Sequence, residues 1–296
     1  MKACLLDLIK WIQTIIKFFI FFFIDLSIAF FSNLFIWKVR RAIVSNDLSD
    51  KIVVITGATD GLGKLTAKFI ASRGATIVLT YRNIVKAQQI HAQILEETNG
   101  NAKVYLIELD LSSLESVRSA ANIILNTVDR VDVLINNGGI MQFRKQYSKD
   151  DHELHFVTNH LSHFLLTNLL LPLLNKSSNA RVVTLSSSAN LLGRIHFKDI
   201  NLKSSFHAVL AGYSQSKIAN ILFVRELARR HPNINCYSLH PGMVRTKIFH
   251  LFPFYLRIIV HAFKYLFMIQ PIEGIQTTLH CSFSDVCRNE TGNHYT

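Results

Sequence analysis

Short apolar runs alternate with amphipathic segments along most of the chain after residue 50. The runs are rich in β-branched residues and too short for buried helices, so each predicts a buried strand. They cover residues 52–55, 76–80, 104–109, 131–135, 181–185 and 234–239. Helical periodicity fills the gaps, most clearly over residues 151–175 and 213–230. This alternation predicts one α/β domain of the Rossmann type over residues 42–296, a doubly wound parallel sheet with helices on both faces.

The N-terminal segment has a different pattern. Residues 18–37 read FFIFFFIDLSIAFFSNLFIW, with Asp25 as the single charge. A run of this length can cross a bilayer, so residues 1–41 are expected to form a hydrophobic anchor helix. Two alternatives stay open. Polar residues recur at helical spacing before the run, which fits a helix lying in the membrane interface. A cleaved secretory signal is disfavoured because the apolar run is too long.

Charge around the anchor favours one topology. Lys38, Arg40 and Arg41 follow the apolar run, and basic residues favour the cytosolic side, so the domain that follows is expected to face the cytosol. The endoplasmic reticulum is the expected membrane. Lysines on the other flank weaken this orientation. The formal net charge of +12 also suits an anionic membrane surface or a phosphorylated ligand. Binding to nucleic acid is disfavoured, because the sequence has neither a basic helix nor the Cys/His spacing of a zinc finger. The cysteines and histidines have no metal-binding spacing, so no metal is expected.

A glycine-rich turn follows the first predicted strand. Residues 56–63 read TGATDGLG, and a helix is predicted from Lys64. Glycines let the backbone approach a pyrophosphate, and the helix N-terminus supplies free N–H groups. This position predicts a dinucleotide site. The spacing is not that of a P-loop, and Leu65 stands where a magnesium-binding hydroxyl would be needed, so phosphoryl transfer is disfavoured.

The end of the second predicted strand bears on the choice of cofactor. The strand is followed by Tyr81-Arg82-Asn83, without the carboxylate that would bind the ribose hydroxyls of NAD. Arg82 can pair with a 2′-phosphate, which favours NADP(H) over NAD(H). Asp60 argues mildly against this preference because it adds negative charge to the glycine loop.

The candidate chemistry lies on the predicted helix that contains Tyr213 and Lys217. Residues at i and i+4 share a helical face, and a nearby ammonium favours the phenolate, so Tyr213 would act as a general acid/base. This spacing alone is common on exposed helices. Its support comes from Ser186 and Ser187 after strand 181–185, from NNGG at 136–139 after another strand, and from Asn159 in an apolar helix. Ligands of open parallel sheets bind at such strand ends.

In this order, TGATDGLG, NNGG, the Asn159 helix, the serine-rich strand end and YSQSK resemble the short-chain dehydrogenase/reductase superfamily, over residues 51–295. LINNGGIM, VTNHLSHFLLT and LHPGMVRT resemble its retinol dehydrogenase branch. The resemblance implies that Tyr213 is the acid/base and that Lys217 binds the nicotinamide ribose and lowers the pKa of Tyr213. Ser187 would orient the substrate oxygen, with Ser186 as the alternative. Asn159 would hold a water in a proton relay.

The predicted cofactor site combines the loop, the strand ends and the segment after the last strand. Its members are Gly57, Thr59, Asp60, Gly61, Leu62, Gly63, Arg82, Asp110, Leu111, Asn136, Gly138, Tyr213, Lys217, Pro241, Gly242, Val244 and Thr246. Two positions depart from the family pattern. Gly138 replaces the alanine of NNAG, and Thr184 replaces an asparagine before the end of the serine-bearing strand. Neither change removes a reacting group.

Residues 248–269 are apolar and aromatic, with a few basic residues at helical spacing. In the superfamily this segment covers the substrate cleft, which implies a lipophilic substrate such as a retinoid, steroid or long-chain aldehyde. A core helix and a membrane-docking helix are the alternatives. The predicted function is hydride transfer between NADP(H) and a lipophilic alcohol/carbonyl pair. A non-catalytic NADP(H)-binding membrane scaffold or sensor is the competing hypothesis. Membrane lipid is an expected partner, and a homodimer is left open.

Overall fold

The computed structural model describes residues 41–142, 144–204, 208–245 and 268–296, together with Ile16, Phe23 and Ser27. The predicted anchor over residues 1–41 lies almost entirely outside these ranges, as do residues 248–267 of the predicted apolar cover. Among the residues that the structure describes, no helix combines the length and apolar character needed to cross a membrane.

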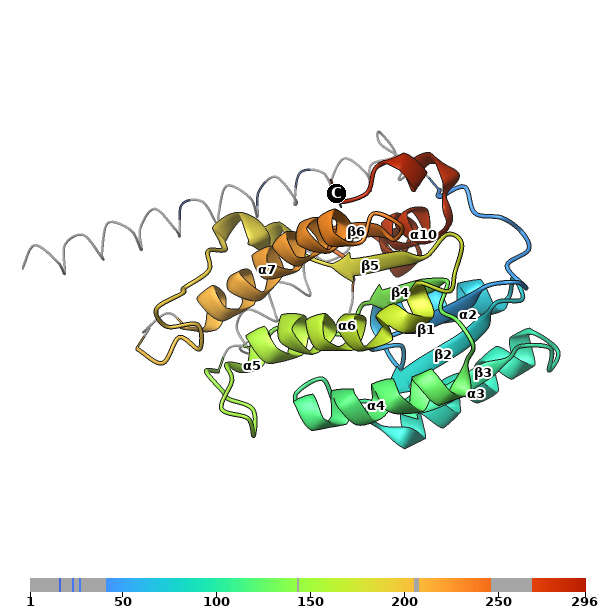
Figure 1. The fold of residues 1–296 in the computed structure, drawn as a ribbon, viewed down its shortest axis with the longest axis horizontal. Coiled ribbons are helices and arrows are strands. Elements are labelled where there is room, and N and C mark those ends of the chain that lie inside the picture. Colours follow the sequence, from blue (N-terminus) through green and yellow to red (C-terminus); the bar gives the residue numbers. More distant parts are fainter. Residues whose placement is uncertain are drawn as a thin grey trace, which may run out of the picture.

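The described ranges contain one parallel sheet of seven strands in the order β3-β2-β1-β4-β5-β6-β7 (Figure 1). The strands are β1 (Ile52–Ile55), β2 (Thr76–Tyr81), β3 (Val104–Glu108), β4 (Val133–Asn136), β5 (Arg181–Leu185), β6 (Asn235–Leu239) and β7 (His294–Tyr295). Because β1 pairs with β2 on one side and β4 on the other, the strand order reverses there. Ligands of open α/β sheets bind at such a reversal.

Helices cover both faces of the sheet. On one face lie α2 (Gly61–Ala71), α3 (Ile84–Glu97) and α10 (Gln276–Phe283), and on the other lie α4 (Leu114–Thr127), α6 (Ser162–Leu174) and α7 (Ala208–Arg230). The short elements are α5 (Leu154–Phe156), η1 (Val157–Leu161), η2 (Ser188–Leu192), α9 (Pro271–Gly274) and η4 (Asp285–Asn289). The predicted parallel sheet with helices on both faces is therefore confirmed over the described residues that follow the predicted anchor.

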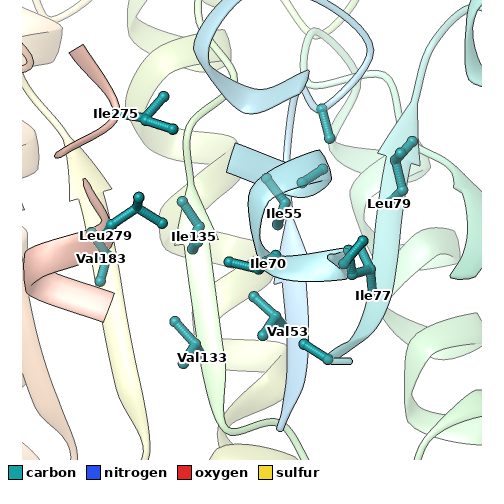
Figure 2. Packing of buried hydrophobic residues seen from close by; sticks show 14 of the residues in the cluster. Val53, Ile55, Ile70, Ile77, Leu79, Val133, Ile135, Val183, Ile275 and Leu279 are labelled. Carbon is teal, nitrogen blue, oxygen red and sulfur yellow. The ribbon is translucent and has the colours of Figure 1, made fainter. Parts of the chain in front are cut away.

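Side-chain alternation along the strands builds two cores. In β1, Val53 and Ile55 face the α2 side while Val54 faces the α4 side, as expected for a strand buried on both faces. Figure 2 shows the first core, where Ile70 of α2 and Leu279 of α10 lie against the strands. Burying large aliphatic side chains contributes about 1.5–3 kcal/mol each, so these layers fix the positions of the strand ends.

The predicted strands match six of the strands within a few residues, but β7 was not predicted. It has only two residues, too few to give a periodic pattern. The helix predicted over 151–175 divides into α5, the π-helical turn η1 and α6. The helix predicted from Tyr213 begins at Ala208. Asn159 lies in the π-helical turn, and such turns are frequent at functional sites.

Candidate active site

The glycine loop joins β1 to α2. Asp60 caps this helix, because its side chain accepts a hydrogen bond from the backbone N–H of Gly61 at 2.9 Å. Gly57 has φ +64°, and a Cβ there would lie 2.7 Å from the Cα of Gly138. At Gly63 a Cβ would lie 2.4 Å from Nδ2 of Asn137. The two glycines therefore let the loop pack tightly against the residues that follow β4, and the loop ends at the N-terminus of α2, where free N–H groups suit a pyrophosphate.

Asn137 fastens the loop to the end of β4. Its Nδ2 donates to the carbonyl oxygens of Thr56 at 2.8 Å and Gly57 at 3.2 Å. In return, the Oγ1 of Thr56 accepts from the backbone N–H groups of Asn137 at 3.0 Å and Gly138 at 2.9 Å. The sequence interpretation assigned no role to Asn137. Its signal was the second asparagine of NNGG, which directly follows a strand.

Asn136 has a different environment from its neighbour. As the last residue of β4 it is buried, and its Nδ2 donates to Oγ1 of Thr167 at 3.0 Å and of Thr184 at 3.3 Å. Its side chain therefore contacts α6 and β5, whereas Asn137 contacts the glycine loop. The predicted cofactor contact of Asn136 stays a prediction. Thr184, one of the two departures from the family pattern, is explained as a partner of this amide.

Gly138, the other departure, lies against Leu111. A Cβ at Gly138 would lie 2.4 Å from Cδ1 of Leu111, so an alanine there would require the end of the leucine side chain to shift. Leu111 belongs to the core on the α4 side. Its neighbour Asp110 is half-buried, and its Oδ1 accepts from the backbone and hydroxyl of Ser112 at 2.9 and 2.8 Å. Both remain predicted cofactor contacts.

The predicted catalytic residues converge beyond the end of β5. Tyr213 and Lys217 lie on one face of α7, with the ammonium 5.6 Å from the centre of the phenol ring. Ser187 hydrogen-bonds the side chain of Tyr213. Ser186 is buried, and its Oγ donates to the carbonyl oxygen of Lys217 at 2.8 Å. Of the two serines, Ser187 is thus the one in contact with the phenol.

Electrostatics at this pair differ from the sequence expectation. Burial raises the pKa of Tyr213, and the hydrogen bond from Ser187 opposes that shift. Burial also lowers the pKa of Lys217 to about 8, because desolvation disfavours the ammonium. The lysine Nζ donates to the carbonyl oxygen of Leu185 at 3.1 Å. A lowered phenol pKa therefore stays a prediction for the site with an oxidised nicotinamide bound, whose positive charge would favour the phenolate.

Asn159 lies beside this pair. Its Nδ2 donates to Oγ of Ser216 and to the carbonyl oxygen of Ile140, each at 3.0 Å, and its Oδ1 accepts from Ile140 N–H at 2.8 Å. The side chain is fully buried. Gly139 runs between the two groups, since a Cβ there would lie 3.1 Å from Asn159 Oδ1 and 3.8 Å from Lys217 Nζ. The strand end after β4 therefore reaches both predicted catalytic residues.

The residues predicted to select the cofactor lie at the end of β2 and on the neighbouring glycine loop. Arg82 follows the strand directly and is exposed, so it is accessible to a ligand. Asp60 on the glycine loop pairs with Lys86 of α3, with Nζ and Oδ2 3.5 Å apart. Lys86 was not predicted, although it lies in the first turn of the following helix. It offsets the negative charge that argued against a phosphate.

The segment after β6 closes on the glycine loop. Val244 is buried and packs with Ile269 and with Leu62 of α2. Gly242 has φ +82°, and Pro241 and Gly242 are half-buried. The structure thus brings Leu62 and Val244, both predicted cofactor contacts, together. Thr59 lies half-buried in the loop, while Thr246 lies outside the described residues.

Comparison with known proteins gives consistent matches. Residues 51–252 match the protein family described as short chain dehydrogenase. The chain is 41% identical over 250 residues to Retinol dehydrogenase 11 of Homo sapiens, covering 84% of this chain and 77% of that protein. It is 37% identical over 275 residues to Retinol dehydrogenase 14 of Homo sapiens, covering 87% and 81%.

Solved structures of similar proteins share the fold of this chain. A crystal structure described as a short chain dehydrogenase from Escherichia coli CFT073, complexed with NADPH, is 26% identical with a TM-score of 0.67 and covers 85% of this chain and 98% of that chain. An uncharacterized protein from Mycobacterium Paratuberculosis is 37% identical with a TM-score of 0.65, covering 81% and 78%. The similarity therefore extends over the region that carries the candidate site.

Proposed function

The chain belongs to the short chain dehydrogenase family, and we propose that, as an oxidoreductase of this type, it transfers a hydride between NADP(H) and a lipophilic alcohol/carbonyl pair. The observation that carries the proposal is the convergence of Tyr213, Lys217, Ser187 and Asn159 beyond the end of β5. A phenol in contact with a serine hydroxyl can hold and protonate a substrate oxygen.

The proposed mechanism assigns one task to each side chain. A nicotinamide bound at this site would supply or accept the hydride. Ser187 donates a hydrogen bond that orients the carbonyl oxygen, and Tyr213 gives that oxygen a proton, or removes one from an alcohol in the reverse direction. Lys217 would hold the nicotinamide ribose, and its ammonium would favour the phenolate. Asn159 holds a water that returns the proton from solvent. Burial of these groups strengthens every one of these interactions.

The residues of the glycine loop fit the dinucleotide. Gly57 and Gly63 let this loop pack closely against residues 138 and 137, and the free N–H groups at the start of α2 would bind the pyrophosphate. We assign Arg82 to the 2′-phosphate, assisted by Lys86 next to Asp60. The solved relative complexed with NADPH supports this preference.

The lipophilic substrate class has two supports. Relatives that this chain matches over most of its length carry the name retinol dehydrogenase, and retinol is an apolar alcohol. The sequence of residues 248–269 is apolar and aromatic, which suits a cover for such a substrate. We propose a retinoid, steroid or long-chain aldehyde.

Membrane attachment is proposed on the sequence. Residues 1–41 would be the anchor and 42–296 the catalytic domain, facing the cytosol at the endoplasmic reticulum. Of the few residues described in this segment, Ile16 and Phe23 are helical and exposed, so their apolar side chains are available to lipid. Lipophilic substrates partition into bilayers, so an enzyme anchored in the membrane would be exposed to a high local substrate concentration.

A substrate panel tests the proposed function. The purified full-length chain, with NADPH or NADH, is assayed on retinal, a steroid ketone and a long-chain aldehyde. We expect turnover with NADPH, a loss of at least about 100-fold in kcat for Tyr213→Phe, and nearly unchanged NADPH binding for that variant. Retained turnover in Tyr213→Phe would refute the acid/base assignment.

Two other outcomes separate the remaining proposals. Tight NADPH binding without turnover on any substrate would favour the non-catalytic scaffold or sensor. Equal affinity for NADH and NADPH, unchanged in Arg82→Ala, would remove the 2′-phosphate argument.

A further inference from the structure

A buried histidine of α6 connects the glycine loop to the catalytic helix. His163 is 1% exposed. Its Nε2 lies 2.8 Å from Oγ1 of Thr56, at the start of the loop, and its Nδ1 lies 3.0 Å from the carbonyl oxygen of Asn159. Both ring nitrogens are therefore hydrogen-bonded within the protein. Nε2 is bonded to the glycine loop, and Nδ1 is bonded to the π-helical turn.

The direction of each hydrogen bond follows from the partners. Asn159 offers a carbonyl oxygen, which only accepts, so Nδ1 of His163 carries the hydrogen. Thr56 Oγ1 already accepts from two backbone N–H groups, so its own hydrogen is directed to Nε2. Burial lowers the pKa of His163 to about 4, which keeps the ring neutral. His163 is therefore a single tautomer, with the hydrogen on Nδ1, and each of its two hydrogen bonds has a fixed direction.

The bridge continues to the catalytic lysine through Asn220 of α7. The Nδ2 of Asn220 donates to the carbonyl oxygen of Asn159 at 3.1 Å and to that of Leu185 at 3.0 Å. Leu185 is the carbonyl that also accepts from Nζ of Lys217 at 3.1 Å. A continuous set of buried hydrogen bonds thus runs from the loop to the ammonium.

We propose that His163 is a positioning residue that couples the placement of the glycine loop to the placement of Asn159 and Lys217. Each bond lies in the interior, where a donor or acceptor that loses its partner is costly to leave unpaired. The groups therefore hold one arrangement together, and a shift at Thr56 is transmitted to the lysine. The functional part of this inference rests on the proposed function, because Lys217 is assigned there.

A double-mutant cycle tests the coupling. Thr56→Val removes the hydroxyl, and His163→Asn keeps a donor near Nδ1 while removing the acceptor at Nε2. We expect each single variant to lower kcat about tenfold and to weaken NADPH binding. The double variant should have about the same kcat and NADPH affinity as the less active of the two single variants. Losses that multiply in the double variant would overturn the proposal, as would an unchanged kcat in Thr56→Val.

Two further variants separate positioning from packing. Thr80→Val is the matched control, because Thr80 is also a buried threonine whose hydroxyl donates to a backbone carbonyl, at 3.3 Å from Ile55 O. It should leave kcat within about twofold. Thr56→Ser restores the hydroxyl and should recover most of the lost kcat. Failure of that rescue would assign the effect to the lost methyl group and refute the coupling.

The readouts also keep this inference separate from the proposed function. NADPH affinity is measured by fluorescence titration and needs no turnover. If the wild-type chain turns over no substrate, the proposed function fails, while the cycle in NADPH affinity still decides whether loop and helix are coupled. If His163→Asn does not fold, His163→Gln replaces it in the cycle, because Thr56 Oγ1 also accepts from the N–H groups of Asn137 and Gly138 and variants of Thr56 alone do not isolate the histidine.

Discussion

Close contacts between a few atoms restrict which side chains fit at the carboxyl ends of the strands. Gly138 and Leu111 share one volume, since a Cβ at 138 would overlap Cδ1 of the leucine. Lys217 is charged yet buried, and the Leu185 carbonyl compensates it only in part. Both positions lead to predictions about single substitutions.

Gly138→Ala should lower the free energy of unfolding by about 1–3 kcal/mol, because the added methyl group overpacks against Leu111. Leu111→Val removes Cδ1 and by itself should cost about 1 kcal/mol. The double variant should be more stable than Gly138→Ala alone, as measured by urea unfolding. Additive losses in the double variant would show that Leu111 already moves aside without cost.

Lys217→Met should abolish turnover yet raise the Tm at pH 7. The pKa of the buried lysine is lowered to about 8 from an ordinary value of 10.5, so between these values the unfolded chain binds more protons than the folded one. Stability from this group therefore rises with pH over that window and is lowest below pH 8. The Leu185 carbonyl stays paired with Asn220 in the variant.

The measurement is thermal unfolding of wild type and Lys217→Met at pH 7 and pH 10. The advantage of the variant should shrink at the higher pH. An equal difference at both values would mean that burial does not penalise the ammonium.

At the scale of elements, a buried acid–histidine pair fixes the start of α7 against α5. Glu153 and His155 are each 1% exposed and lie 2.8 Å apart through Oε1 and Nδ1. The Nε2 of His155 accepts from Gln142 N–H at 3.1 Å, and Glu153 Oε2 accepts from Phe156 N–H at 2.8 Å. The pair therefore ties the loop after β4 to the helix that carries Tyr213, whose ring meets that of His155 edge-on at 6.0 Å.

Gly212→Ala tests this contact. A Cβ there would lie 2.7 Å from the carboxylate carbon of Glu153, which its hydrogen bonds hold in place. In an ordinary helix interior the change would stabilise by about 0.5–1 kcal/mol. Here we expect a loss of about 1–3 kcal/mol and a lower kcat, because residue 212 precedes Tyr213. Urea unfolding and steady-state kinetics measure both, and a gain in stability would show that the carboxylate withdraws freely.

At the scale of the whole molecule, one buried arginine joins segments distant in sequence. Arg181 at the start of β5 is 2% exposed, and its Nη1 donates to the carbonyl oxygens of Cys281 at 3.2 Å and Ser284 at 2.8 Å. These carbonyls lie at the end of α10, so the arginine ties the C-terminal helix to the sheet.

Arg181→Met should lower the free energy of unfolding by about 2–4 kcal/mol, since two carbonyls lose their donor. Its control is Arg229→Met on the exposed end of α7, where the arginine pairs with Glu226. That variant should leave the Tm nearly unchanged because solvent screens exposed pairs. A similar Tm for both variants would contradict the structural role of Arg181.

The fold was predictable because runs such as 52–55 are rich in β-branched residues and too short for a buried helix, which favours a buried strand. The two-residue β7 carries no such pattern. The candidate catalytic residues could be named from the sequence by their types and order, but the hydrogen bonds that connect them could not. Asn137 and His163 gave signals no stronger than their neighbours, and contacts between α6, the loop and β4 depend on three-dimensional packing. The fit between Gly138 and Leu111 likewise could not be predicted, since it joins two different loops.

That fit has a consequence for how sequences of this kind can change. An alanine at 138 requires the side chain at 111 to shift or to be shortened, so the order of the two mutations matters. Changing 138 first passes through a less stable intermediate, whereas trimming 111 first opens a small space that the alanine then fills. Ancestral reconstruction or library screens that vary one position at a time would therefore score the alanine as harmful.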